Sequence, residues 1–150
     1  MSARPRLVLG LGSPHGDDQA GWLVVDALHR LQAPPDVARK LADPTEVWVW
    51  ASPGVDLIVC DASQGTGPAG TVRAWSWPQD VFPVPGQRST HRYPLVDVLE
   101  LGRALGLCPE RVLLWTIEGR AFAPDTSPDQ TIVAAAEMVA RQLAEMLVNA

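Results

Sequence analysis

The sequence predicts a single α/β domain over residues 1–150, with helices on both faces of a mostly parallel, twisted sheet of about five strands. Three observations predict this three-layer α/β/α fold. Short apolar runs are typical of strands that are buried on both faces. Segments with apolar residues at helical spacing alternate with these runs. The 150 residues, 47% hydrophobic and 19% charged, suit one globular domain and argue against disorder.

The expected strands differ in pattern. Residues 7–12 form an apolar run that stops at glycine, and residues 55–61 repeat the pattern but end at an acid. Residues 112–117 form another apolar run. The partial alternation in residues 71–77 favours an edge or antiparallel strand. Residues 47–50, Val-Trp-Val-Trp, fit a strand or a short helical turn, and their alternation favours a strand.

Helices are expected over residues 18–31, 94–105 and 129–147, where apolar residues recur on one side. Asp17 or Asp18 would lie at the N-terminus of the first helix, where free amides and the helix dipole favour an anion. Proline at position 94 suits the start of the second helix, because its missing amide hydrogen is not needed there.

Composition excludes several classes of function. The formal net charge of −5 disfavours a general nucleic-acid binder. The N-terminus leads into a short strand, not a signal peptide, and no apolar run is long enough to span a bilayer, so we expect a cytoplasmic protein without a membrane partner. Two cysteines, Cys60 and Cys108, cannot form a disulfide framework or a site of four thiolates.

Acidic residues follow two of the expected strands. Asp17 and Asp18 come after the first strand, and Asp61 ends the strand over residues 55–61. In open α/β sheets, ligands bind beyond the carboxyl ends of the strands, so Asp18 and Asp61 would face one crevice if their strands are neighbours. The loop between residues 77 and 94 could add His91. Two carboxylates and an imidazole suit nickel, zinc or iron better than calcium.

Each of these residues also has a purely structural interpretation. Asp17 or Asp18 can cap a helix, and Asp61 can hydrogen-bond its own backbone in a turn. A histidine in a loop, such as His91, is most often simply exposed. His15 shares the first loop with the acidic pair and is a further candidate.

Other chemistries lack their motifs. The glycines at 10, 12 and 16 do not have the G-x-G-x-x-G spacing of dinucleotide-binding turns, and two acids at the helix start would repel a pyrophosphate. G-x-S-x-G and H-E-x-x-H are absent, and neither cysteine has an apparent catalytic partner.

Four segments, in order, resemble the hydrogenase maturation proteases. Residues 10–21, Gly-Leu-Gly-Ser-Pro-His-Gly-Asp-Asp-Gln-Ala-Gly, are similar to the first strand and acidic loop of that family. Residues 57–71 resemble its apolar strand that ends in Asp-Ala before a glycine-rich turn. Residues 89–95 place a histidine just before a helix, and residues 112–128 resemble the family's last strand and helix start.

The resemblance implies a phosphorylase/hydrolase-like fold and an endopeptidase. Such an enzyme removes the C-terminal extension of the large-subunit precursor of a nickel–iron hydrogenase after nickel insertion. The implied metal contacts are Asp18, Asp61 and His91, with nickel supplied by the substrate. Asp18 and Asp61 would be catalytic, and Asp17 would orient water or cap the helix. A monomer or weak dimer is expected.

The sequence also departs from the family pattern. Ser13 replaces the family's asparagine, the first loop is one residue shorter, and Asp43-Pro44-Thr45 replaces a Gly-Gly-Thr stretch close to the site. We expect Asp43, Thr45 and His15 to contact the substrate. The altered stretch motivates an alternative function, a non-proteolytic chaperone or metal-sensing module in hydrogenase assembly. Of the six tryptophans, Trp48 and Trp50 are candidates for contact with the large subunit.

Overall fold

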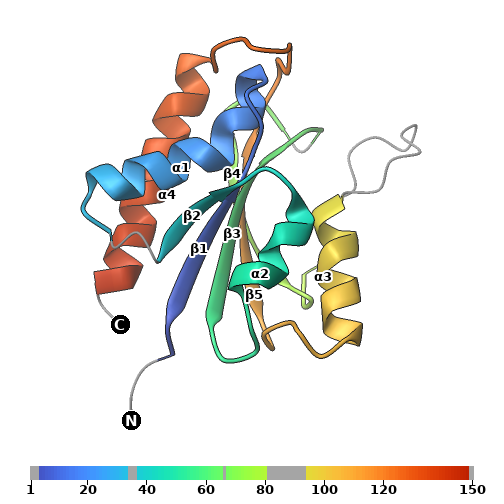
Figure 1. Cartoon of the computed structure of the whole chain (residues 1–150). Helices are drawn as coiled ribbons and strands as arrows, with labels where there is room; N and C mark the ends of the chain where they lie inside the picture. Colours follow the sequence, from blue (N-terminus) through green and yellow to red (C-terminus); the bar gives the residue numbers. More distant parts are fainter. Residues whose placement is uncertain (1–3, 34–36, 66, 81–93, 149–150) are drawn as a thin grey trace.

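The computed structural model describes residues 4–33, 37–65, 67–80 and 94–148 (Figure 1). The strands are β1 (Arg6–Leu11), β2 (Ala38–Leu41), β3 (Asp56–Ser63), β4 (Val72–Trp77) and β5 (Val112–Glu118). The α-helices are α1 (Ala20–Arg30), α2 (Val47–Trp50), α3 (Pro94–Ala104) and α4 (Gln130–Val148). Two short 3-10 helices, η1 (Gly16–Gln19) and η2 (Pro44–Glu46), precede α1 and α2.

The sheet has the order β2-β1-β3-β5-β4. β2, β1, β3 and β5 are parallel, whereas β4 pairs antiparallel with β5 at the edge. The predicted α/β class and the edge position of β4 are therefore confirmed. Because β2 lies on one side of β1 and β3 on the other, the winding of the chain reverses between β1 and β3.

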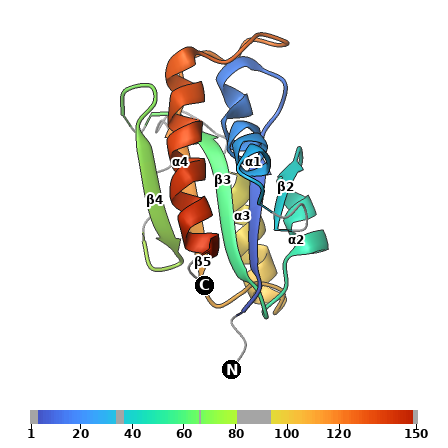
Figure 2. The same cartoon turned by 90° about the vertical axis from the view of Figure 1, so that its left-hand side faces the viewer.

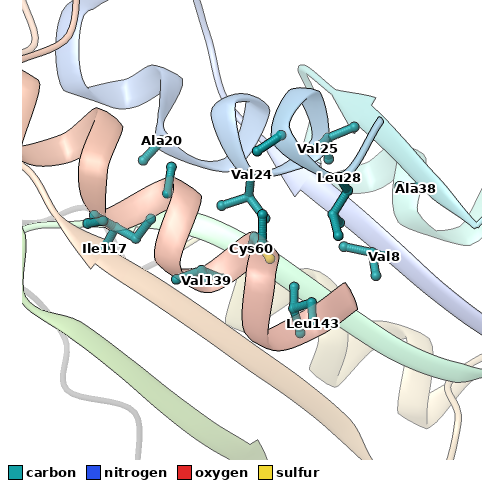
Figure 3. Packing of buried hydrophobic residues seen from close by; sticks show 14 of the residues in the cluster. Val8, Ala20, Val24, Val25, Leu28, Ala38, Cys60, Ile117, Val139 and Leu143 are labelled. Carbon is teal, nitrogen blue, oxygen red and sulfur yellow. The ribbon is translucent and has the colours of Figure 1, made fainter. Parts of the chain in front are cut away.

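Helices cover both faces of the sheet, as Figure 1 and Figure 2 show. α1 and α4 pack together on one face, where buried residues such as Val8, Cys60 and Val139 form one core cluster (Figure 3). α2 and α3 lie on the other face above a second cluster that includes Leu9 and Leu114. Successive strand residues point to opposite faces, so continuous apolar runs in the strands fill both clusters.

α1 approaches the sheet closely at two glycines. A Cβ atom on Gly10 would overlap the carbonyl oxygen of Gly21. A Cβ atom on Gly21 would overlap the carbonyl oxygen of Leu11 and lie 2.5 Å from that of Cys60. The first turn of α1 therefore lies directly on the backbones of β1 and β3, which no other residue type would allow.

The strand prediction for residues 47–50 was wrong, because this segment is the helical turn α2. Its start is fixed by Asp43, whose Oδ1 accepts a hydrogen bond from the Thr45 amide (2.9 Å), and by Pro44 at the first position of η2. Val47 is fully buried, and Trp48 packs against Gly102 of α3. Tertiary packing therefore makes residues 47–50 helical, although their alternating sequence pattern favours a strand.

β2 was missed by the sequence analysis. Its four residues include Arg39 and Lys40, so they show no apolar run. They form a strand because they pair in parallel register with β1 at the sheet edge. None of the helices in the described ranges is long and apolar enough to cross a bilayer.

We predict that Gly21→Ala lowers the free energy of unfolding by about 1–3 kcal/mol, because the added methyl group forces α1 away from β1 and β3. Urea unfolding followed by circular dichroism would measure it. The matched control is Gly54→Ala, where a Cβ atom meets nothing within 4 Å, so stability should stay equal or rise by up to about 1 kcal/mol. Equal effects of the two substitutions would contradict the close-approach argument.

Candidate active site

A pocket of about 260 Å³ lies beyond the carboxyl ends of β1 and β3, at the point where the winding of the sheet reverses. It contains two carboxylates, Asp18 and Asp61. Its other lining residues among those described are Leu11, Gly12, Ala42, Pro44, Ala62 and Leu95. The expectation that Asp18 and Asp61 face one crevice is met because β1 and β3 are adjacent and parallel.

Asp18 lies on η1, in the loop that joins β1 to α1. The side chain is half-buried, and its Oδ2 accepts a hydrogen bond from the Ser13 hydroxyl at 2.5 Å. The Ser13 amide also donates to the Asp18 carbonyl oxygen (3.3 Å), and the Asp18 amide donates to the His15 carbonyl oxygen (3.0 Å). Hydrogen bonds within the loop therefore hold Ser13 and His15 against Asp18.

Asp61 lies within β3, which continues two residues beyond the predicted end of the strand. It is paired in register with Thr116 of β5. Its Oδ1 accepts a hydrogen bond from the Ala62 amide at 2.8 Å, so the local backbone contact proposed for Asp61 does form. This contact orients the carboxylate and coexists with its place in the pocket.

His91, the third residue of the predicted metal site, lies outside the described residues. Within the described residues, no three His, Cys, Asp or Glu side chains are grouped so that they could hold a metal ion. The complete acid–acid–histidine set therefore stays a prediction, of which the described part of the chain provides two carboxylates in one pocket.

Asp17 has an entirely different environment from its neighbour. The residue is only 1% exposed. Its Oδ2 accepts hydrogen bonds from the amides of Arg120 (2.8 Å) and Ala121 (3.0 Å), and its Oδ1 accepts one from the amide of Asp129 (3.0 Å). Asp17 therefore fastens η1 to the segment between β5 and α4, and it is absent from the described lining of the pocket.

These contacts determine the ionisation of Asp17. Burial alone would raise the pKa of the carboxyl group, but the amide hydrogen bonds from Ala121, Asp129 and Arg120, together with the Arg120 charge, lower the pKa overall. The expected capping role is not observed: α1 begins after Gln19, and no side chain caps it.

Two of the residues expected to contact substrate, Asp43 and Thr45, flank the pocket residue Pro44 in the sequence. Asp43 accepts hydrogen bonds from the amide (2.9 Å) and hydroxyl (2.8 Å) of Thr45, which lower its pKa. Pro44 between them lines the pocket. His15 Nδ1 faces the Asp125 amide at 3.4 Å, a long hydrogen bond. Among the described lining residues none is Asp43, Thr45 or His15, so their contact with substrate stays a prediction.

The sequence analysis did not single out Glu118, a buried carboxylate at the end of β5 that is 4% exposed. Glu118 accepts hydrogen bonds from the Ser63 hydroxyl (3.0 Å) and the Gly65 amide (2.7 Å), and so fixes the chain just after Asp61. An acid at the end of an apolar strand was the available signal, because it is the same pattern that singled out Asp61.

The cysteines provide no nucleophile near the two aspartates. Burial raises the pKa of the Cys60 thiol, and the nearby Asp61 charge raises it further. Burial also raises the pKa of Cys108. A thiol with a raised pKa is a poor source of the reactive thiolate.

A second, larger hollow of about 620 Å³ lies between β4 and α3 and is lined by Trp77, Val96 and Arg103, among others. Among its described lining residues are none of the predicted site residues. The two tryptophans expected to contact the large subunit differ in exposure: Trp48 is half-buried against α3, whereas Trp50 is 42% exposed and stacks with Arg39.

Comparison with solved structures finds the same fold in other proteins. The chain superposes on the [NiFe] hydrogenase maturation protease HycI from Thermococcus kodakarensis KOD1 with a TM-score of 0.72 and 23% identity, over 97% of this chain and 94% of that one. The fold is that of the hydrogenase maturation proteases. The hydrogenase maturating endopeptidase HybD from E. coli gives a TM-score of 0.70 and 24% identity, over 95% and 91% of the two chains.

A solution structure of the endopeptidase HycI from Escherichia coli also matches, with a TM-score of 0.72 and 20% identity, over 93% of this chain and 89% of that one. No protein-family model matches the sequence, and no curated protein sequence matches it significantly. The resemblance drawn from the motifs is thus confirmed as a likeness of fold.

We predict that Asp17→Asn lowers the free energy of unfolding by about 1–3 kcal/mol, because an amide nitrogen would replace one oxygen that accepts buried hydrogen bonds. Urea unfolding at pH 7 would measure the change. Asp26→Asn is the control. Within the described residues, the Asp26 side chain forms only a surface ion pair with Lys40 (2.9 Å), which should contribute less than about 1 kcal/mol. A loss no larger than that of the control would contradict the anchoring role.

The same carboxylate should make stability depend on pH. Because folding lowers the pKa of Asp17, its stabilisation is fully present above the unfolded value of about 3.9 and is lost as pH falls through the lower folded value. The native protein should therefore lose stability more steeply below about pH 4 than Asp17→Asn does. Unfolding midpoints measured from pH 7 to pH 2 would show this, and parallel curves would refute it.

Proposed function

We propose that this protein is an endopeptidase of hydrogenase maturation, which removes the C-terminal extension of a nickel–iron hydrogenase large-subunit precursor after nickel insertion. The observation that carries the proposal is the placement of Asp18 and Asp61 in one pocket at the reversal point of the sheet. The likeness of fold to HycI and HybD, together with the motif resemblance, supports the choice of substrate.

Nickel enters this proposal as part of the substrate. The possible metal ligands at the pocket fit a nickel ion, because Asp18 and Asp61 provide carboxylate oxygens and His91 would add an imidazole nitrogen. A divalent metal ion can polarise a carbonyl group or lower the pKa of a bound water molecule. Asp18, Asp61 and His91 would hold the metal-bearing part of the precursor in place.

The remaining pocket residues determine how the substrate enters. Leu11, Ala62 and Leu95 provide apolar walls beside the two carboxylates. The turn at Pro44 closes the side next to β2, and its backbone is fixed by the hydrogen bonds between Asp43 and Thr45. A substrate tail would therefore meet a preformed wall here, where the family pattern has two flexible glycines.

Asp17 does not serve as the general base in this proposal. Its two carboxylate oxygens already accept three amide hydrogen bonds, and the lowered pKa makes it a weak base. Its contribution is to hold η1, and with it Asp18, at the sheet edge.

We predict that the native protein shortens a nickel-loaded large-subunit precursor by a defined C-terminal peptide, which mass spectrometry would detect. Asp18→Asn and Asp61→Asn should slow the cleavage by about 100-fold or more, the effect typical of losing a group that acts at the reacting atoms. Asp56→Asn is the control, because Asp56 lies at the opposite end of β3 and pairs only loosely with Arg4 at the surface (3.8 Å).

The same experiment distinguishes the peptidase from a chaperone or metal-sensing module. A precursor that is bound but left intact by the native protein would reject the peptidase and favour the alternative function. Cleavage that is undiminished in both Asp18→Asn and Asp61→Asn would locate the active site away from this pocket.

A further inference from the structure

We infer that Ser13 is the positioning residue of Asp18: its hydroxyl group holds Oδ2 of the carboxylate and leaves Oδ1 to the bound substrate. This inference rests on the proposed function, because it assumes that Asp18 binds the metal-bearing substrate. It assigns a role to a position at which this chain departs from the family pattern.

The hydrogen bond between Ser13 and Asp18 is the first observation. The hydroxyl oxygen of Ser13 lies 2.5 Å from Oδ2 of Asp18, a separation typical of a hydroxyl group that donates to an ionised carboxylate. In the described part of the chain, this hydroxyl is the one hydrogen-bond donor to the Asp18 carboxylate. The second oxygen, Oδ1, therefore has no competing donor there.

The backbone around Asp18 is held independently of this contact. Asp17 is fastened by three amide hydrogen bonds, and its own amide donates to the Ala121 carbonyl oxygen at 2.7 Å. Gly16 has a φ of +56°, which favours glycine, and its amide donates to the Thr126 carbonyl oxygen at 3.1 Å. Because the backbone is fixed, the Asp18 carboxylate can still move only by rotation of its side chain. The hydrogen bond from Ser13 restricts this rotation.

The type of residue at position 13 fits this role. Serine carries one O–H donor on a short side chain, whereas the family's asparagine has a longer side chain with two N–H donors and a carbonyl acceptor. The replacement therefore keeps a donor near the carboxylate and removes a group that could compete for it. The short serine side chain lies within hydrogen-bond distance of Asp18.

Groups that hydrogen-bond to a metal ligand typically change metal affinity by about 10–100-fold when they are removed. Ser13→Ala should therefore weaken binding of Ni²⁺ alone by about 10-fold in isothermal titration calorimetry, and it should lower kcat/KM for precursor cleavage by a similar factor. Ser13→Thr retains the hydroxyl donor and should therefore restore both values to within about threefold of the native protein. The added methyl group accounts for the remaining difference.

Two controls separate positioning from folding. Ser52→Ala changes an exposed serine in the turn before β3 and should leave both affinity and cleavage unchanged. Thermal unfolding of Ser13→Ala should match that of Ser13→Thr. A loss of Ni²⁺ affinity that Ser13→Thr does not restore would indicate a merely structural role and would overturn the inference.

The outcomes distinguish this inference from the proposed function. If the native protein cleaves the precursor and Ser13→Ala cleaves it equally well, the role of Ser13 is rejected and the peptidase stands. If the native protein binds Ni²⁺ without cleaving and Ser13→Ala binds it about 10-fold more weakly, the peptidase is rejected and the role of Ser13 stands. If the native protein neither cleaves nor binds Ni²⁺, both are rejected.

Discussion

The contact of α1 with the sheet at Gly10 and Gly21 is the constraint on which the candidate site depends. Because neither residue has a side chain, the first turn of α1 lies on the backbones of β1 and β3. That contact fixes η1, which immediately precedes α1, at the carboxyl edge of the sheet. Asp18 then reaches the pocket that also contains Asp61. Gly10 and Gly21 of the first motif thus serve helix–sheet packing, whereas the glycines of a dinucleotide-binding turn would hold a phosphate.

The adjacent aspartates Asp17 and Asp18 have different roles. Asp17 is buried and uses its charge to satisfy three amide groups of the segment after β5, so it ties the first loop to the last crossover. Asp18 remains half-buried, with one oxygen held by Ser13 and a place in the pocket lining. A fixed carboxylate must be supported by its neighbours, and Asp17 and Ser13 provide that support through the backbone and the side chain respectively.

The layer of α2 and α3 completes the pocket from the other face of the sheet. Leu95 of α3 and Pro44 of η2 both line the pocket. Trp48 of α2 joins α2 to α3, because it packs against Gly102 and donates a hydrogen bond to the Val98 carbonyl oxygen at 3.3 Å. Glu118 and Ser63 fix the chain beyond Asp61 in a similar manner. Four separate segments of the sequence, residues 11–18, 42–44, 61–62 and 95, therefore contribute to the pocket, which is typical of sites at the reversal point of an α/β sheet.

The sequence by itself determined the fold class, most elements, and the presence of acids after β1 and at the end of β3, because apolar periodicity and acids that follow apolar runs are local signals. Tertiary structure alone decided that residues 47–50 are helical and that residues 38–41 form a strand, since packing against α3 and pairing with β1 outweigh local pattern. It also separated Asp17 from Asp18. Two neighbouring identical residues have the same local sequence signal. Folding brings the amides of residues 120, 121 and 129 close to Asp17, which gives Asp17 a structural role, whereas Asp18 lines the pocket.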